Sequence, residues 1–250
     1  MALNAFPPLF SGTGRTSSVD FPKRRPAVGS VECGLVSTTE GAAMKIGVIG
    51  SGHIGGNLTR RLTAVGHDVT VANSRGPQTL RSLGGETGAE TGTVEEAIQH
   101  SDLVMVAVPL MAVPDLPGEL LAGKVVVDAD NYYPDRDGDI PELMNGTTSS
   151  RWTAEHFPAA RLVKAFNTIA AQHLLENGSP PGTPGRIALP VAGDDPDAKR
   201  VVMDLVDAIG FDPVDGGGLD DSWRQQPGTP IYLADRDADG VRQGLAEARR

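Results

Sequence analysis

The stretch KIGVIGSGHIGGNLTRRLTAVGHDVTVANSRGP, residues 45–77, determines the fold that we expect for the chain. It opens with a short apolar run and continues with the pattern G-x-G-x-x-G at Gly50, Gly52 and Gly55. Apolar residues at helical spacing then predict a helix over 54–65, and a second β-branched run follows it. A strand, a glycine loop, a helix and a second strand form the context in which this pattern binds a dinucleotide.

Each glycine of the pattern has a physical task. Gly50 permits a tight turn, Gly52 lets the backbone approach a pyrophosphate, and Gly55 lets helix and strand pack closely. The helix N-terminus offers unpaired N–H groups to the anion. The alternative is a glycine-rich turn without a ligand. The residues expected to bind the cofactor in this loop are Gly50, Ser51, Gly52, His53, Ile54 and Gly55.

The end of the second predicted strand indicates which dinucleotide is bound. An NAD-specific site places an acid here, which accepts hydrogen bonds from the ribose 2′-OH and repels a 2′-phosphate. This chain has Asn73, Ser74 and Arg75 instead. Ser74 can donate a hydroxyl, and Arg75 provides a charged fork suited to phosphate oxygens. The missing acid and the added cation favour NADP(H) over NAD, although Arg75 could also be an ordinary surface arginine.

Strand and helix signals alternate along the rest of the chain. Thr93 and Glu96 form a capping box for a helix that ends near His100, and Asp195 with Pro196 begins another helix. This alternation predicts an α/β fold, a Rossmann-type doubly wound parallel sheet in a single domain with a short C-terminal extension. The further strands are expected at 102–109, 124–130, 161–167, 186–193 and 211–215.

Composition limits the class of protein. The net charge of −10 over 250 residues argues against binding to nucleic acid or to an anionic membrane surface. The single cysteine is consistent with a reducing, cytoplasmic location. Residues 1–43 mix Pro, Gly and Ser without periodicity, so we expect a disordered N-terminal extension before an NADP-binding Rossmann domain at 44–250. We expect either that Met44 is the natural start or that the extension is a dispensable tail.

Seven segments together resemble a known family. They are MKIGVIGSGHIGGNL, ANSRGP, VAVP, DADNYYP, VKAFNTI, PVAGDD and SWRQQPGTP. They resemble the NADP oxidoreductases typified by the NADPH-dependent reductase of the deazaflavin coenzyme F420. The resemblance implies that the glycine loop holds the pyrophosphate, that Ser74 and Arg75 bind the 2′-phosphate, and that the protein is a homodimer. One position departs from the family, because Thr79 stands where a second basic residue is usual; Arg81 could compensate.

The reaction implied by the resemblance is hydride transfer between NADPH and a deazaflavin or similar flavin-like acceptor. It requires two flat rings held face to face more than it requires acid–base chemistry, and we identify no catalytic residue. Parallel sheets bind ligands at the carboxyl ends of their strands. We therefore expect Ala107, Val108, Pro109 and Leu110 to line the dinucleotide path, and Phe166, Asn167 and Thr168 to approach the nicotinamide.

Other functions remain open at this point. The chain could reduce a small carbonyl or imine substrate, as pyrroline-carboxylate reductases and hydroxyacid dehydrogenases do, or act as a non-catalytic NADP(H) sensor. No metal site is expected, because the histidines lack ligand spacing and the acidic segment 235–240 lacks the closing glutamate of a calcium loop. Tyr132, Tyr133, Trp223 and Arg224 could stack on a ring or form a dimer contact.

Overall fold

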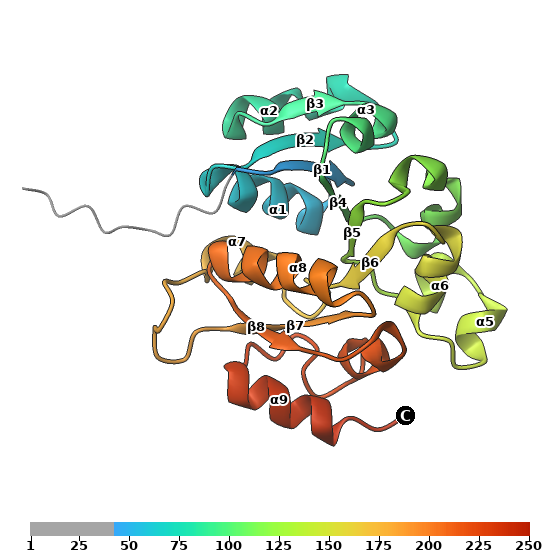
Figure 1. The fold of residues 1–250 in the computed structure, drawn as a ribbon, viewed down its shortest axis with the longest axis vertical. Coiled ribbons are helices and arrows are strands. Elements are labelled where there is room, and N and C mark those ends of the chain that lie inside the picture. The colour runs from blue at the N-terminus through green and yellow to red at the C-terminus, as the bar shows by residue number, and fades with distance from the viewer. Residues whose placement is uncertain (1–42) are drawn as a thin grey trace, which may run out of the picture. The chain divides into compact units, whose positions relative to one another are not determined.

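The computed structural model describes residues 43–250, so the predicted extension 1–43, apart from its last residue, lies outside the described residues. Within that part, eight strands form one sheet in the order β3-β2-β1-β4-β5-β6-β7-β8 (Figure 1). The strands are β1 (Lys45–Ile49), β2 (Asp68–Ala72), β3 (Glu90–Gly92), β4 (Leu103–Val106), β5 (Val125–Asp128), β6 (Arg161–Lys164), β7 (Ala188–Gly193) and β8 (Asp212–Asp215).

The helices connect the strands and cover the sheet. Two of them follow their predicted signals closely: Thr93 and Glu96 form the expected capping box before α3, and Asp195 caps α8 through its side chain. The α-helices are α1 (His53–Ala64), α2 (Arg81–Thr87), α3 (Val94–Gln99), α4 (Pro134–Asp137), α5 (Pro141–Met144), α6 (Ser149–His156), α7 (Ala171–Glu176), α8 (Pro196–Ala208) and α9 (Ala238–Glu247). The 3-10 helices are η1 (Pro77–Leu80), η2 (Leu110–Asp115), η3 (Gly118–Leu121) and η4 (Leu219–Gln225).

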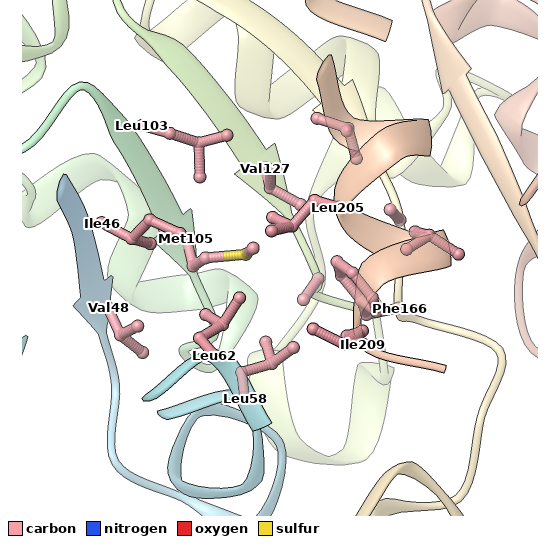
Figure 2. Close-up of a cluster of buried hydrophobic side chains, with 14 of the residues drawn as sticks. Ile46, Val48, Leu58, Leu62, Leu103, Met105, Val127, Phe166, Leu205 and Ile209 are labelled. Carbon is pink, nitrogen blue, oxygen red and sulfur yellow. The ribbon is translucent and has the colours of Figure 1, made fainter. Parts of the chain in front are cut away.

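Both faces of the sheet are buried, which confirms the doubly wound α/β fold. Alternate residues of a strand enter different cores: Leu103 and Met105 of β4 pack with α1 and α8, whereas Val104 and Val106 pack on the opposite face near α3 and α6. Figure 2 shows the first of these cores, where Leu58 and Leu62 of α1 lie near Met105, and where Leu205 of α8 and Ile209, which follows α8, pack beside Phe166.

The order of the strands places a crevice at the carboxyl end of β1. This strand pairs in parallel with β2 on one side and with β4 on the other, so that Ile46 lies opposite both Val69 and Leu103. The connection after β1 leads to β2 on one side and the connection after β4 leads to β5 on the other, so the loops that follow these two adjacent strands separate there. In open α/β sheets this is the position at which ligands bind.

The sheet is not entirely parallel, which corrects our prediction. β7 runs antiparallel to β6, with Val163 opposite Gly193, and β8 is parallel to β7. A parallel crossover usually needs a helix that returns the chain along the whole sheet. Here α7 has six residues, about 9 Å of helix, and the stretch SPPGTPG at 179–185 follows it. The chain therefore enters β7 from the carboxyl edge.

Two further parts of the fold differ from expectation. β3, with only three residues, was not predicted, because a strand this short carries no clear alternation. The segment expected as a C-terminal tail contains η4 and α9, and Val241 and Leu245 of α9 pack on Ala188 and Val214 in a third small core. Within residues 43–250, no helix has the length and apolar composition needed to cross a bilayer.

Candidate functional site

The glycine loop between β1 and α1 has the backbone that its sequence requires. Gly50 has φ +103°, and a Cβ there would lie 2.1 Å from the Ala107 carbonyl oxygen. A Cβ at Gly55 would lie 1.9 Å from the carbonyl oxygen of Gly50, so loop and helix are in direct backbone contact. A Cβ at Gly52 would meet nothing within 4 Å. The loop is thus tightly packed behind and open in front.

The N-terminus of α1 faces this open side. Its N-cap residue is Gly52, which has no side chain that could accept a hydrogen bond from the first N–H groups of the helix. His53 and Gly52 are exposed. Unpaired N–H groups, the positive end of the helix dipole and an approachable backbone are the features that bind phosphate oxygens.

Asn73 holds the turn after β2 in shape. Its Nδ2 donates to Ser51 Oγ at 2.9 Å and to Thr79 Oγ1 at 3.1 Å, and its Oδ1 accepts from the Arg75 N–H at 2.9 Å. The sequence predicted Asn73 as a cofactor-binding residue that removes the repulsion of an acid. In the structure it also ties the glycine loop to the turn that carries Ser74 and Arg75. Thr79, where the resemblance implies a basic residue, is a partner in that turn.

Arg75 is an exposed cation at the rim of the crevice. Within residues 43–250 it forms no ion pair, and Ser74 beside it is exposed as well. The half-buried Arg60 of α1 is by contrast paired with Glu86 at 2.7 Å. Arg75 is therefore ready to bind an anion. Arg81, the first residue of α2, is also exposed.

Two pockets meet at the glycine loop. The first, with a volume of about 560 Å³, lies between the loop, the Ser74–Arg75 turn and the start of η2. The second, of about 490 Å³, lies between the start of α1 and the ends of β5 and β6. Both volumes are in the range of small-molecule sites. The residues that line both pockets are Gly52, Ala107, Val108 and Pro109.

The pockets collect most of the residues predicted for the site. Gly50, Ser51 and the 73–75 turn line the first pocket, while His53, Ile54, Phe166 and Asn167 line the second. Three predicted residues border neither pocket. Leu110 is fully buried in the core, Gly55 packs behind the loop, and Thr168 is buried with its carbonyl accepting the Leu233 N–H at 2.8 Å.

Phe166 and Asn167 border the second pocket but are engaged by the protein. The Phe166 side chain packs in the core (Figure 2), and its backbone has φ +63°, a strained conformation for a non-glycine residue. Asn167 Nδ2 donates to the Gln225 carbonyl at 2.6 Å, and its Oδ1 accepts from Gln225 Nε2 at 3.0 Å. Asn131 Nδ2 donates to the Asn167 carbonyl at 2.8 Å. This amide network joins β6 to η4.

Tyrosines form the far wall of the second pocket. The hydroxyls of Tyr133 and Tyr232 are hydrogen-bonded to each other, and burial raises the pKa of Tyr232 above its usual value, with the bond to Tyr133 contributing. The Arg136 guanidinium lies 4.9 Å from the centre of the Tyr133 ring. Leu233, the next residue of this wall, has φ +55°. Apart from Tyr133, whose role was left open, these residues were not predicted.

A buried charged cluster lies behind the second pocket. Lys164 Nζ and Asp128 Oδ2 are 3.1 Å apart, and both side chains are completely buried. Asp130, two residues further, is also buried and lines the pocket. The register of the two strands brings these side chains together, because Asp128 of β5 lies opposite Lys164 of β6. The sequence held one signal, a lysine inside the apolar strand RLVKAFN, that indicates a buried partner.

Other candidate residues lie outside the two pockets. Trp223 has Arg224 and Arg250 near its ring, each 5.3 Å from the ring centre, and Tyr132 donates its hydroxyl to the Gly138 carbonyl at 2.8 Å. A dimer contact through Trp223 stays a prediction. In the acidic segment 235–240, Asp237 caps α9. Among the described residues, no group of three His, Cys, Asp or Glu side chains is arranged to hold a metal ion.

Comparisons with known proteins identify relatives of this chain by sequence and by fold. The family model described as NADP oxidoreductase coenzyme F420-dependent matches residues 45–132. The crystal structure of a hypothetical protein, SMa0349, from Sinorhizobium meliloti is 34% identical with a TM-score of 0.68, over 77% of this chain and 94% of that one. A structure described as a proposed F420-dependent NADP reductase from Arthrobacter sp. FB24 is 27% identical with a TM-score of 0.61, over 71% and 86%.

The metalloreductases among the curated relatives are longer proteins. Metalloreductase STEAP3 of Rattus norvegicus is 33% identical over 193 residues, which is 76% of this chain and 37% of that protein. The chain spans less than half the length of the curated relatives it matches. The family model matches the first part of the described residues, and a relative 34% identical spans nearly its whole length in common with this chain. The chain belongs to the coenzyme F420-dependent NADP oxidoreductase family.

Proposed function

We propose that this member of the coenzyme F420-dependent NADP oxidoreductase family transfers a hydride between NADPH and a deazaflavin or similar flat, flavin-like acceptor. The observation that carries the proposal is the pair of pockets that share Gly52 and Val108. A dinucleotide needs one binding region for each half, joined at the pyrophosphate. NADPH, when bound, supplies the hydride and its two electrons; the residues of the chain bind, orient and exclude water.

The first pocket is suited to the adenosine 2′-phosphate. Arg75 and the Ser74 hydroxyl stand at its rim, and no acid ends β2. Two carboxylates, Glu95 and Asp115, also line this pocket. They make the surroundings unfavourable for an anion except beside Arg75, in a chain whose net charge is already −10. The preference for NADP(H) therefore rests on Arg75 and on the turn that Asn73 holds.

The second pocket is suited to two stacked rings. Ile54, Pro109 and Ala129 give it apolar surface, while Tyr133 and Tyr232 close its far side. No residue there is needed as a nucleophile, which is consistent with a reaction that consists of holding two rings in contact. Two non-glycine residues with positive φ, Phe166 and Leu233, border this pocket, and backbone strain of this kind gathers at functional sites.

One observation favours an alternative substrate class. The second pocket contains groups that could donate a proton: the Asp130 carboxyl when it is protonated, and the one hydroxyl proton that the hydrogen bond between Tyr133 and Tyr232 leaves free. Reduction of a carbonyl or imine needs a proton at the oxygen or nitrogen in addition to the hydride, and a positioned acid supplies it. A small carbonyl or imine acceptor is therefore the second candidate.

A turnover assay with four acceptors tests the proposal. Purified protein is mixed with NADPH or NADH and with the oxidised deazaflavin, FMN, a cyclic imine or a small ketone, and oxidation of the nicotinamide is followed by absorbance. We expect the deazaflavin to be reduced faster than the other acceptors, and faster with NADPH than with NADH. Faster reduction of the imine or ketone would establish the alternative. Tight NADPH binding without turnover on any of the four would indicate the sensor.

Matched variants test the phosphate site. Arg75→Ala removes a charge-assisted contact of about 1.5–3 kcal/mol, so NADPH affinity should fall roughly tenfold to hundredfold while NADH affinity stays within about twofold. Arg242→Ala removes an exposed arginine on α9, outside both pockets, and should have a much smaller effect. If the two variants lose NADPH affinity equally, Arg75 has no special role in the site.

A further inference from the structure

Asp130 is a buried carboxyl to which hydride transfer to a flavin-like acceptor assigns no task. Its Oδ1 accepts from the Val108 N–H at 2.8 Å. Its Oδ2 is buried and has no hydrogen-bond partner among the described residues. A buried polar atom without a partner costs free energy, so its presence in the wall of a pocket indicates a role for a ligand or a proton.

The cations near Asp130 are already paired with other carboxylates, so none is left to balance the charge of an ionised Asp130. The Lys164 ammonium is 3.1 Å from Asp128, and it also donates to the backbone carbonyl of Asp130. Asp128 in turn accepts from the Asp130 N–H at 2.9 Å. The next cation, Arg136, is paired with the buried Asp137 at 2.8 Å. An ionised Asp130 would therefore leave one uncompensated negative charge in the cluster.

The elements packed around the pocket supply the other titratable groups. These are Asp128 on β5, Lys164 on β6, Arg136 on α4, Tyr133 before it, Tyr232 in the C-terminal segment and His53 at the start of α1. Burial raises the pKa of Asp130 well above its usual value and the Asp128 carboxylate raises it further, while Lys164, the Val108 N–H and Arg136 act in the opposite direction. Asp130 thus holds its proton to a higher pH than an exposed aspartate does.

The inference rests on the proposed function, in which the nicotinamide half of the cofactor binds in the second pocket. We propose that Asp130 distinguishes oxidised from reduced cofactor: it stays protonated beside the uncharged dihydronicotinamide and releases its proton to solvent when the cationic nicotinamide of NADP⁺ binds. A positive ring in this low-dielectric wall favours the carboxylate, whereas a neutral ring does not. The Asp130 carboxylate would then supply the negative charge that the cationic ring needs.

Calorimetry can count the proton. NADP⁺ and NADPH are titrated into the protein at one pH in two buffers of different ionisation enthalpy, which gives the number of protons released for each dinucleotide. Both dinucleotides carry the same 2′-phosphate, which also titrates near neutrality, so only the difference between them reports on the nicotinamide. We expect NADP⁺ to release up to about one proton more than NADPH.

Variants and pH identify the group. Asp130→Asn keeps the size and polarity of the neutral acid and should abolish the difference in proton release. Asp135→Asn, an exposed aspartate on α4, should leave it unchanged. In the wild type, the ratio of NADP⁺ to NADPH affinity should rise with pH by up to about tenfold per unit, and in Asp130→Asn it should be flat.

The outcomes separate the two proposals. Equal proton release with both dinucleotides in the wild type, or an unchanged difference in Asp130→Asn, would overturn the role of Asp130 while leaving cofactor binding intact. Failure of both dinucleotides to bind the wild-type protein would overturn the proposed function and, with it, this inference. The wild-type proton count does not depend on the folding of any variant.

Discussion

Replacing Gly55 by alanine tests whether the backbone contact beneath the glycine loop is essential. The new methyl carbon would lie 1.9 Å from the Gly50 carbonyl oxygen and 2.8 Å from its carbon. Neither group can rotate away, because both belong to the backbone. Loop and helix would have to separate by roughly 1 Å or more, and overpacking of this kind costs about 1–3 kcal/mol.

The neighbouring glycine provides the control. A Cβ at Gly56 would meet only the end of the Arg60 side chain, at 3.3 Å, and the Ser51 carbonyl oxygen, at 3.6 Å. The Arg60 side chain can move aside. Since alanine is the better helix former, Gly56→Ala should be neutral or stabilising by up to about 1 kcal/mol. The two variants add the same methyl group one residue apart, and their free energies of unfolding should differ by about 1–4 kcal/mol.

Thermal unfolding and cofactor binding measure the difference. For a domain of this size, 1 kcal/mol corresponds to roughly 2–4 °C in Tm, so Gly55→Ala should melt several degrees below Gly56→Ala. A separation of about 1 Å also moves the first N–H groups of α1 out of hydrogen-bond range of a bound phosphate, so NADPH affinity should fall by roughly tenfold or more. If both variants melt within about 1 °C of each other and bind NADPH equally, the contact at Gly55 does not constrain the loop.

Three further predictions concern the buried polar groups. Lys164→Met leaves Asp128 buried and unpaired, so the free energy of unfolding should fall by about 3–5 kcal/mol; a urea midpoint equal to the wild type would contradict it. Gln225→Ala removes the donor to Asn167 Oδ1 and should cost about 1–3 kcal/mol in the same measurement; no loss would show that water replaces the amide. The raised pKa of Asp130 means that its contribution to stability is complete below the pKa of an unfolded aspartate and is lost as pH rises toward the folded value. The Tm of Asp130→Asn minus that of the wild type should therefore increase from pH 5 to pH 8, and a constant difference would be evidence that Asp130 is already ionised.

The parts of the fold that the sequence predicted well are those with local causes. The turn at Gly50 needs a positive φ, and the contact at Gly55 needs the absence of a Cβ, so both requirements are visible in the residue type. The capping box at Thr93 and Glu96 is formed by residues three positions apart. Backbone conformation and short-range hydrogen bonds can be predicted in this way because no distant partner is involved.

The direction of β7 could not be predicted in the same way. A buried strand has the same apolar pattern whether it runs parallel or antiparallel to its neighbour. The direction of a strand depends on the edge of the sheet at which the preceding connection ends. Here the connection made by the short α7 and the segment 179–185 ends at the carboxyl edge of the parallel strands, so β7 begins there. The proline and glycine residues of that segment excluded a long helix, which was the available clue.

The far wall of the second pocket depends on contacts between distant residues. Tyr133 and Tyr232 are 99 residues apart, and Asp128 meets Lys164 only through strand register. A single sequence does not carry such pairings in its periodicity. The DAD run at 128–130 did show two acids at the end of an apolar strand, but whether they face solvent or a buried lysine is decided by the neighbouring strand.

The late position of Tyr232 and Leu233 also sets the order in which the site is completed during synthesis. The last residue along the chain that lines the first pocket is Pro117, whereas the last one that lines the second pocket is Leu233. At roughly 5–20 residues per second, a ribosome makes the second wall several seconds after the first. A growing chain therefore contains the phosphate-binding half of the site while Asp130 and the ends of β5 and β6 still lack the cover that Tyr232 and Leu233 provide.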